Sequence, residues 1–475
     1  MADLRVTTTM GQEAVLAEEA VEEFNVSLRG EMLRHGDEGY DEARTVFNAM
    51  IDRHPSLIVR CAGVADVISA VKFAGTNKLL VAVRGGGHNI SGSAVCDGGI
   101  VIDLSQMKGM HIDPAARKVR AEAGLTWGEL NHDLQAFGLA ATGAFMSTTG
   151  IAGLTLGGGL GWLVRKYGLA CDNLLSVDIV TADGQFLTTN LTQNQDLFWG
   201  VRGGGGNLGV VTSFEFQVHP VSTVVAGLVI HPIARAKETL QFWRDYAATA
   251  PEELTDGAVL LNAPPAPFLP KEAHGTPVVS VYGVHTGAID AGEQVIQPLR
   301  EFGPPLADIF QAMPFSATQT MVDFAWPPGF HNYWKSSFLR GLSDDAIDTI
   351  LTYFAVVPSP LTVVVIEHNG DGAMNRVSES ETAFGHRDWS YNLLITSLWD
   401  DPATSEKNIT WTREFWEAMQ PFTSDGVYVN YLGEEGEDRV KAAYAAPTYE
   451  RLVALKNKYD PTNLFRLNQN IKPTV

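Results

Sequence analysis

Cysteine is nearly absent from this chain, which has three such residues, Cys61, Cys96 and Cys171, among 475. Their odd number and irregular spacing fit neither a disulfide framework nor a zinc site. We therefore expect no metal centre, free thiols and a reducing, cytoplasmic compartment. The first residues, Met1 to Glu23, are dotted with acids and lack an apolar block, so we expect no secretory signal.

Basic residues are also scarce, because 34 Lys and Arg stand against 55 Asp and Glu, which gives a net charge of −21. An acidic surface repels nucleic acids and anionic membranes, so we expect neither as a partner. An uninterrupted apolar run is missing too. The uncharged segment from Ala136 to Val164 is broken repeatedly by glycine, so we interpret it as buried ligand-binding loops and not as a membrane span.

Glycine, in contrast, gathers in three clusters, Arg84-Gly85-Gly86-Gly87-His88, Gly150 to Gly161 and Arg202 to Asn207. Because glycine lacks Cβ, such loops let backbone amides approach an anionic ligand, and the arginine of the first cluster adds donors suited to phosphate. The third cluster also matches the dinucleotide fingerprint, Gly204-x-Gly206-x-x-Gly209. The fingerprint requires a following helix, whereas Val210–Phe216 alternates like a strand, so we reject a Rossmann site. We expect the three loops to converge on one long, phosphate-bearing ligand.

The pattern of elements changes near residue 220. Up to about residue 50 we expect a helical lead-in, and from there to residue 220 short strands alternate with helices. Strands are expected at 56–59, 79–83, 100–102, 118–121 and 174–180. Helices are expected at 64–73 and from the Thr126 capping box to Phe137. After residue 220, helices at 239–248, 291–297, 345–354 and 406–419 alternate with strands at 278–281, 361–366 and 391–395. A last helix is expected at 449–459. Helices over an antiparallel sheet in the second region predict an α+β fold.

Four motifs occur in a fixed order: the Arg84–His88 loop, the Gly150–Gly161 cluster with Arg165-Lys-Tyr-Gly168, the block from Asp196 to Asn207, and the tail Asp460-Pro-x-Asn-x-Phe-Arg-x-x-Gln-x-Ile471. In this combination the sequence resembles the FAD-linked oxidases of the vanillyl-alcohol oxidase superfamily, in the berberine bridge enzyme-like branch. The resemblance runs from about residue 25 to the end. It is weakest between about residues 225 and 420.

The resemblance implies an α+β fold with a PCMH-type FAD-binding domain in two parts, residues 1–220 and 426–475. Residues 221–425 would form a substrate domain with an antiparallel sheet flanked by helices. The histidine that matches His88 is bonded covalently to the flavin in relatives. By the same resemblance we expect further FAD contacts at Arg84, Gly85, Gly86, Gly87, Asn89, Ser91, Thr148, Thr149, Gly150, Gly153, Gly157, Gly158, Gly161, Val210, Asn430, Asn468 and Gln469.

Two positions distinguish this chain within the resemblance. Relatives with a second covalent link carry a cysteine where this chain has Met146, and a thioether cannot form that bond, so we expect a single link through His88. Cys171, the nearest thiol in sequence, is interpreted as a small buried residue. Thr149 occupies the position that gates oxygen in relatives, and its small side chain favours an oxidase.

The resemblance also implies a proton acceptor in the stretch Tyr428-Val429-Asn430-Tyr431, with Tyr431 as base, Tyr428 as the second candidate and Asn430 near the flavin. If this stretch is a strand, Tyr428 and Asn430 share one face and Tyr431 has the other. A free tyrosine has a pKa of about 10, so the base needs a cationic neighbour, for which Lys335 and His386 are candidates. The alternative is that both tyrosines only pack within a sheet.

The expected function is an FAD-dependent oxidase that takes hydride at flavin N5 from a carbon bearing OH or N, uses O2 and makes H2O2. Its substrate would be a small alcohol, amine or sugar-like molecule. A dehydrogenase with another electron acceptor and a flavin-binding protein without turnover remain as alternatives. We expect Phe330–Lys335, Glu367-His368 and His386-Arg387 to line the pocket. Both a monomer and a homo-oligomer are compatible with the sequence.

Overall fold

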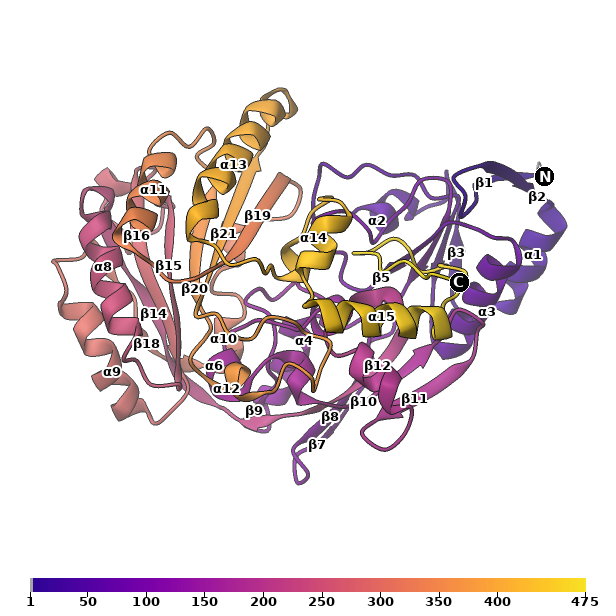
Figure 1. The fold of residues 1–475 in the computed structure, drawn as a ribbon, viewed down its shortest axis with the longest axis horizontal. Helices are drawn as coiled ribbons and strands as arrows, with labels where there is room; N and C mark the ends of the chain where they lie inside the picture. Colours follow the sequence, from indigo (N-terminus) through magenta and orange to yellow (C-terminus); the bar gives the residue numbers. More distant parts are fainter. Residues whose placement is uncertain (1–2) are drawn as a thin grey trace.

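The computed structural model describes residues 3–475, which form two halves lying side by side (Figure 1). One half holds both the N-terminal and the C-terminal segments of the chain. The other half is built on an eight-stranded sheet formed from residues between 223 and 399. Within the described residues, no helix is both long and apolar enough to cross a bilayer.

The first half begins with a four-stranded sheet in the order β3-β4-β6-β5. Its strands β4, β6 and β5 are parallel, and β3 is antiparallel to β4. The bounds are β3 (Glu31–Leu33), β4 (Leu57–Arg60), β5 (Val81–Arg84) and β6 (Ile100–Asp103). Helix α3 (Val64–Thr76) buries Val67, Ala70, Val71 and Ala74, whose helical spacing forms one apolar face.

A five-stranded antiparallel sheet in the order β11-β10-β12-β8-β7 lies on the other side of α3, which contacts both sheets. Its strands are β7 (Met110–Asp113), β8 (Lys118–Glu122), β10 (Leu174–Val180), β11 (Phe186–Asn190) and β12 (Val210–Gln217). The third glycine cluster therefore leads into a strand, as expected from the alternation after Gly209. The expected capping box is confirmed as well, since the Thr126 side chain accepts from the Glu129 amide at the start of α4 (Trp127–Gln135).

Short elements connect these sheets and carry the glycine clusters. The helices are α5 (Ile151–Leu156), α6 (Val164–Tyr167) and α7 (Gln195–Gly200), and β9 (Leu139–Ala140) pairs with β13 (His219–Pro220). The uncharged segment 136–164 is therefore a series of loops around short elements.

The second half is an antiparallel sheet in the order β17-β14-β16-β15-β20-β21-β19, with β18 also paired to β14. Helices α8, α9, α11 and α13 cover one face of this sheet, in agreement with the expected helices (Figure 1). The strands are β14 (Thr223–Pro232), β15 (Leu254–Asn262), β16 (Pro277–His285), β17 (Ala307–Asp308), β18 (Gln311–Pro314), β19 (His331–Leu339), β20 (Val363–His368) and β21 (Tyr391–Trp399). The helices are α8 (Ala236–Ala247), α9 (Ile289–Glu301), α10 (Phe315–Thr318), α11 (Asp344–Phe354), α12 (Ala373–Arg376) and α13 (Ser405–Met419).

After α13 the chain returns to the first half, where α14 (Glu437–Ala442) and α15 (Ala446–Tyr459) pack. Helix α15 contacts α7, so residues far apart in sequence share one core. The domain limits at residues 220 and 426 stay predictions. The mixed α+β class and the helix-covered antiparallel sheet are confirmed.

Two expectations about local structure were wrong. The first 50 residues are not a helical lead-in, because they contain β1 (Leu4–Thr7), β2 (Glu13–Leu16), α1 (Glu18–Ser27) and α2 (Tyr40–Arg44) besides β3. Gly11, at a φ of 72°, makes the turn between β1 and β2. The stretch from Tyr428 to Tyr431 is not a strand but a 3₁₀ turn, in which the Tyr431 amide donates to the Tyr428 carbonyl at 3.0 Å.

Candidate active site

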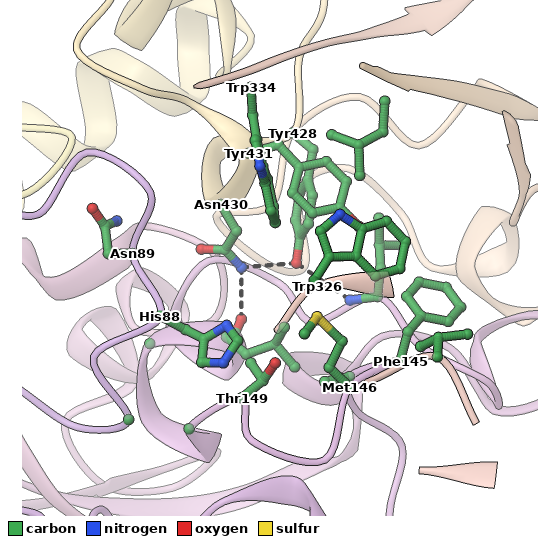
Figure 2. Close-up of a pocket in the computed structure, with 18 of the residues that line it drawn as sticks. His88, Asn89, Phe145, Met146, Thr149, Trp326, Trp334, Tyr428, Asn430 and Tyr431 are labelled. Carbon is green, nitrogen blue, oxygen red and sulfur yellow. Dashed lines mark hydrogen bonds between the residues drawn. The ribbon is translucent and has the colours of Figure 1, made fainter. Parts of the chain in front are cut away.

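A continuous cavity of about 620 Å³ lies between the two halves (Figure 2). One wall consists of the loop after β5, the segment around Ala144–Gly153, the third glycine cluster and the tail at Phe465–Gln469. The opposite wall is the face of the eight-stranded sheet that its helices leave free. Cofactor and small-molecule sites typically measure about 300–1,000 Å³, so the cavity is large enough for such a ligand.

The first two glycine clusters meet backbone to backbone at this cavity. A methyl group on Gly86 would overlap the backbone nitrogen of Gly150, and one on Gly150 would overlap the nitrogen of Gly86. Larger residues would force the loops apart. The glycines therefore let two loops approach closely and present their amide groups at one wall.

His88 stands at the exit of the first loop and faces the cavity (Figure 2). Its Nε2 lies 2.7 Å from the hydroxyl of Thr148, and its ring stacks on Phe47 at a centroid distance of 4.2 Å. Burial lowers the pKa of His88 to about 4, so the imidazole is neutral at physiological pH.

The structure brings most of the expected cofactor positions to the cavity. Those that line it are Gly85, Gly86, Gly87, His88, Asn89, Thr149, Gly150, Gly153, Val210, Asn430, Asn468 and Gln469, together with Tyr428 and Tyr431.

Six expected contacts lie behind the wall instead. The Arg84 guanidinium donates to the Ala43 carbonyl, and the Ser91 hydroxyl donates to Asn89 Oδ1 at 2.5 Å. Thr148 supports His88. The other three are glycines packed against protein: Gly157 against Asn430, Gly158 against Phe384 and Gly161 against Gly143.

A buried ion pair fixes the tail that carries Asn468 and Gln469. Lys456 Nζ lies 2.7 Å from Asp460 and also donates to the carbonyls of Asn207 and Phe465. Asp460 in turn accepts from the amides of Leu464 and Phe465 at 2.7 and 2.9 Å. The tail motif therefore joins its own turn to the third glycine cluster.

The cavity wall offers polar groups to a long ligand with phosphates and amide-like edges. Asn468 Nδ2 donates to the Phe465 carbonyl, whereas its buried Oδ1 has no partner among the described residues. With the backbone amides of the glycine loops, this fits FAD, whose dinucleotide needs donors and acceptors along its length. The described residues contain no cluster of three or more potential metal ligands.

The two tyrosines of the 3₁₀ turn have different surroundings. The Tyr428 oxygen accepts from the amides of Gly159 and Leu160 at 3.0 and 3.3 Å and from Asn430 Nδ2 at 2.7 Å. Asn430 also donates to the Leu154 carbonyl, so the pair fixes this turn against the second glycine cluster (Figure 2). The hydroxyl oxygen of Tyr428 therefore has its hydrogen-bond partners within the protein.

Tyr431 points to a carboxylate of the opposite sheet. Its hydroxyl donates to Glu367 Oε1 at 2.8 Å, and Glu367 Oε2 accepts from Asn392 at 2.8 Å and Asn369 at 3.3 Å. Burial raises the pKa of Glu367 to about 7 and, together with this carboxylate, raises the pKa of Tyr431 well above its ordinary value. Tyr431 therefore keeps its proton at neutral pH, and the carboxylate is the group of the two that is available to accept a proton.

Sheet register places a second tyrosine beside Glu367. Gly257 pairs with Glu367 on one side and with Tyr282 on the other. A methyl group on Gly257 would overlap the Tyr282 hydroxyl, so the glycine gives room for that ring to lie across the strand toward Glu367. Sequence reasoning missed Tyr282, because only the pairing of distant strands brings it to the site.

Several expected placements were wrong. Lys335 pairs with Glu435 at 2.5 Å, and His386 Nε2 lies 2.9 Å from the Ala442 carbonyl, so neither is the partner of the Tyr431 hydroxyl. Of the three segments expected to line the pocket, only Trp334 and Glu367 do so. His368 lies on the other face of β20 because side chains alternate along a strand.

The two distinguishing positions of the chain face the cavity. Met146 and Thr149 both line it, in the loop next to His88 (Figure 2). Cys171 is fully buried and is not a lining residue, which agrees with its interpretation as a small packed side chain.

Comparison with known proteins identifies the family. A family model described as an FAD binding domain matches residues 55–190, and one described as berberine and berberine like matches residues 427–472. An FAD-linked oxidoreductase of Dictyostelium discoideum is 31% identical over 461 residues, which cover 96% of this chain and 98% of that protein. The chain belongs to the FAD-linked oxidoreductases of the berberine bridge enzyme-like type. This confirms the resemblance drawn from the four motifs, with FAD as cofactor.

Two further comparisons, one of sequence and one of structure, support the family and the fold. The (R)-6-hydroxynicotine oxidase of Paenarthrobacter nicotinovorans is 33% identical over 459 residues, 94% of this chain and 98% of that enzyme. The crystal structure of 6-hydroxy-D-nicotine oxidase from Arthrobacter nicotinovorans matches with a TM-score of 0.85 at 30% identity, over 94% of this chain and 98% of the other. The protein is therefore an FAD-dependent oxidoreductase with a small-molecule substrate.

Proposed function

We propose that this protein is an oxidase that removes hydride from a substrate carbon bearing OH or N, with Glu367 and Tyr431 as its proton-accepting pair. The observation that carries the proposal is the 2.8 Å hydrogen bond between these two residues, on the wall opposite the His88 loop. When bound, the flavin of FAD supplies a two-electron acceptor for hydride. The chain must supply the acceptor for the accompanying proton.

The geometry supports a path with two coupled proton transfers. A substrate O–H or N–H held at the Tyr431 oxygen gives its proton to that oxygen while the tyrosine proton moves to Glu367. Asn369 and Asn392 hold the other carboxylate oxygen and so keep the acceptor in place. Tyr428, which accepts three hydrogen bonds from protein groups, positions Asn430 and takes no part in the transfer.

We also propose that His88 forms the single covalent link to FAD. Its neutral imidazole is a nucleophile at physiological pH. If Nε2 donates its proton to Thr148, the lone pair is on Nδ1, which is then the atom that forms the bond. Met146 in the neighbouring loop offers no thiol for a second bond.

Acid precipitation of the holoenzyme tests this link. We expect yellow colour in the wild-type pellet and, for His88→Ala, colour in the supernatant, because the glycine loops still bind FAD without the bond. Two-dimensional NMR of the flavin peptide should assign the bond to Nδ1. Wild-type colour wholly in the supernatant would overturn the covalent assignment without affecting the proposed oxidation.

Oxygen is the proposed electron acceptor. Two facts support it: the small Thr149 lines the cavity, and the Paenarthrobacter relative is named an oxidase. Anaerobic reduction of the flavin by a panel of amines, aryl alcohols and sugars should be followed by rapid reoxidation in air with release of one H2O2 per turnover. Reduction that only quinones reverse would indicate a dehydrogenase, and a flavin that no substrate reduces would indicate a binding protein.

We also propose that the enzyme is cytoplasmic. The three cysteines are buried and unpaired, as is usual in a reducing compartment, which supports this location. Light scattering of the holoenzyme would distinguish a monomer from a homo-oligomer.

A further inference from the structure

The substrate side of the cavity has an apolar floor. It is formed by residues of four strands of the eight-stranded sheet, whose side chains share one face of that sheet. Their apolar side chains are Leu228, Ile230, Val259, Leu261, Val278 and Val365, with Leu394 of a fifth strand beside them. A floor of this kind excludes a ligand that carries many hydroxyl groups, because each would lose its hydrogen bonds with water and find no partner.

One acidic group interrupts this floor. Glu367 lines the cavity, whereas no Lys or Arg among the described residues does so. Its hydrogen-bond partners, Tyr431, Asn392 and Asn369, are all uncharged. The cavity therefore holds a buried carboxylate whose charge no protein group balances. A buried charge is costly unless it is paired, and the missing partner is a cation.

Two tyrosines, Tyr431 and Tyr282, lie beside the same carboxylate, and each packs against a tryptophan. Tyr431 lies edge-on to Trp334 at 6.1 Å between ring centroids, and Tyr282 lies edge-on to Trp162 at 5.8 Å. All four side chains line the cavity. Faces of tyrosine and tryptophan attract organic cations, so these rings and Glu367 favour the same charge.

Where the cavity meets solvent, its lining is again aromatic. Phe268 and Phe324 both line it and are nevertheless 45% and 55% exposed. Phe268 belongs to the loop after β15 and follows Pro264 and Pro265, which also line the cavity. Exposed apolar side chains at the mouth of a pocket are typical of an entrance for an apolar ligand.

We propose that the substrate is an apolar, ring-bearing amine that binds as a cation, with its nitrogen at Glu367 and Tyr431 and its rings on the apolar floor. This inference rests on the proposed oxidation and narrows its substrate to one class. Oligosaccharides and hydroxy acids are excluded, the former by the floor and the latter by the repulsion between two carboxylates.

The chemistry of a secondary amine balances at this site. The protonated amine R₂CH–NH₂R′⁺ loses the proton on nitrogen to Glu367 through Tyr431 and loses hydride from carbon to the oxidised cofactor. The iminium R₂C=NHR′⁺ that results keeps the positive charge beside the aromatic rings. Water then converts it to the ketone R₂C=O and the ammonium R′NH₃⁺, and O2 receives the hydride with one proton as H2O2.

A binding experiment with matched probes tests the charge preference without turnover. The holoenzyme is titrated with benzyltrimethylammonium and with its uncharged isostere neopentylbenzene, and the change in flavin absorbance is recorded. We expect the cation to bind at least about tenfold more tightly, a difference of about 1.4 kcal/mol. In Glu367→Gln the ratio should fall several-fold, to the smaller preference that the aromatic rings give alone, whereas Tyr431→Phe, which keeps the carboxylate, should retain the wild-type ratio.

Retention of the flavin spectrum shows that each variant is folded. Equal affinity for the two probes in the wild type, or a ratio in Glu367→Gln that is as high as in the wild type, would overturn the inference. Anaerobic flavin reduction separates this result from the proposed function. Reduction of the flavin by sugars or hydroxy acids but not by N-methyl-1-phenylethylamine would contradict the amine assignment. The proposed oxidation would still be supported. A cation preference in a protein whose flavin no donor reduces would support the preference of the site for a cation and would contradict the proposed oxidation.

Discussion

At the scale of single residues, the chemistry of the site depends on the environment of Glu367. Three uncharged donors hold its carboxylate, and burial raises its pKa to about 7. A carboxylate with such a pKa can accept a proton at neutral pH and still return it to solvent, which a carboxylate with an ordinary pKa does less well. In the proposed path Tyr431, whose pKa is raised well above its usual value, stays uncharged and passes the proton on to Glu367.

The acidic limb of the pH profile follows from this environment. Glu367 must be deprotonated to accept a proton, so kcat/KM should rise with pH through about 7 and level off above it. In Glu367→Gln this limb should disappear, and kcat/KM should fall by about 10²–10⁴-fold, the range that a lost general base costs. Steady-state peroxide assays between pH 5 and 9 measure both effects.

Tyr428→Phe is the matched control for that prediction, since it removes a tyrosine hydroxyl of the same turn that is bonded to Gly159, Leu160 and Asn430. We expect the limb near pH 7 to remain in this variant. If the acidic limb of the pH profile stays in Glu367→Gln, or if it disappears in Tyr428→Phe, a group other than Glu367 accepts the proton.

The sequence could not predict the role of Glu367, although it placed this residue in a pocket-lining segment. The partner of Tyr431 is set by the register of β20 against β15 and β21, which pairs Glu367 with Gly257 and Asn392. Residues more than 60 positions apart meet only after the sheet has formed. The expectation of a cationic neighbour, Lys335 or His386, failed because both face other partners.

At the scale of elements, local patterns predicted well wherever local energetics decide. The Thr126 capping box, the strand that follows Gly209 and the helices α8, α9, α11 and α13 were expected and are present, whereas the short helices α10 and α12 were not expected. The 3₁₀ turn at Tyr428 was missed because the alternation of residues there imitates a strand. Its side chains are instead held by tertiary hydrogen bonds to the second glycine cluster.

The buried pair on α15 should be important for holding the C-terminal tail. In Lys456→Met the carboxylate of Asp460 loses its cation inside the protein, and the free energy of unfolding should fall by about 3–5 kcal/mol. The carbonyls of Asn207 and Phe465 lose a donor as well. Chemical denaturation followed by tryptophan fluorescence measures the change, and the flavin spectrum should report a loosened cofactor.

A second lysine of the same helix is the control. Lys458 pairs with Asp196 at 2.6 Å, but the side chains are 59% and 39% exposed. Lys458→Met should therefore change the free energy of unfolding by less than about 1 kcal/mol. Similar losses in the two variants would mean that helix propensity, and not the buried pair, sets the stability of the tail.

At the scale of the whole molecule, the site exists only where the two halves meet, so their relative placement must be fixed. Arg165 of α6 crosses this boundary with its side chain 2% exposed. It donates to the carbonyls of Gly370, Pro251, Leu254 and Ala250 and lies 3.6 Å from Asp256 of β15. The planar guanidinium group of arginine has several N–H donors, so it can bond several carbonyls that a lysine would leave unpaired.

Removing this arginine should weaken the coupling of the two halves. In Arg165→Met the carbonyls and Asp256 stay buried without their cation, so we expect the free energy of unfolding to fall by about 3–5 kcal/mol. In calorimetry we expect one transition for the wild type and two for Arg165→Met, because the sheets of each half keep their own cores. Arg376→Met, which breaks the exposed pair with Glu252, should keep one transition. A single, unshifted transition in Arg165→Met would mean that the apolar contacts around the cavity, centred on residues such as Trp162 and Trp334, hold the halves together by themselves.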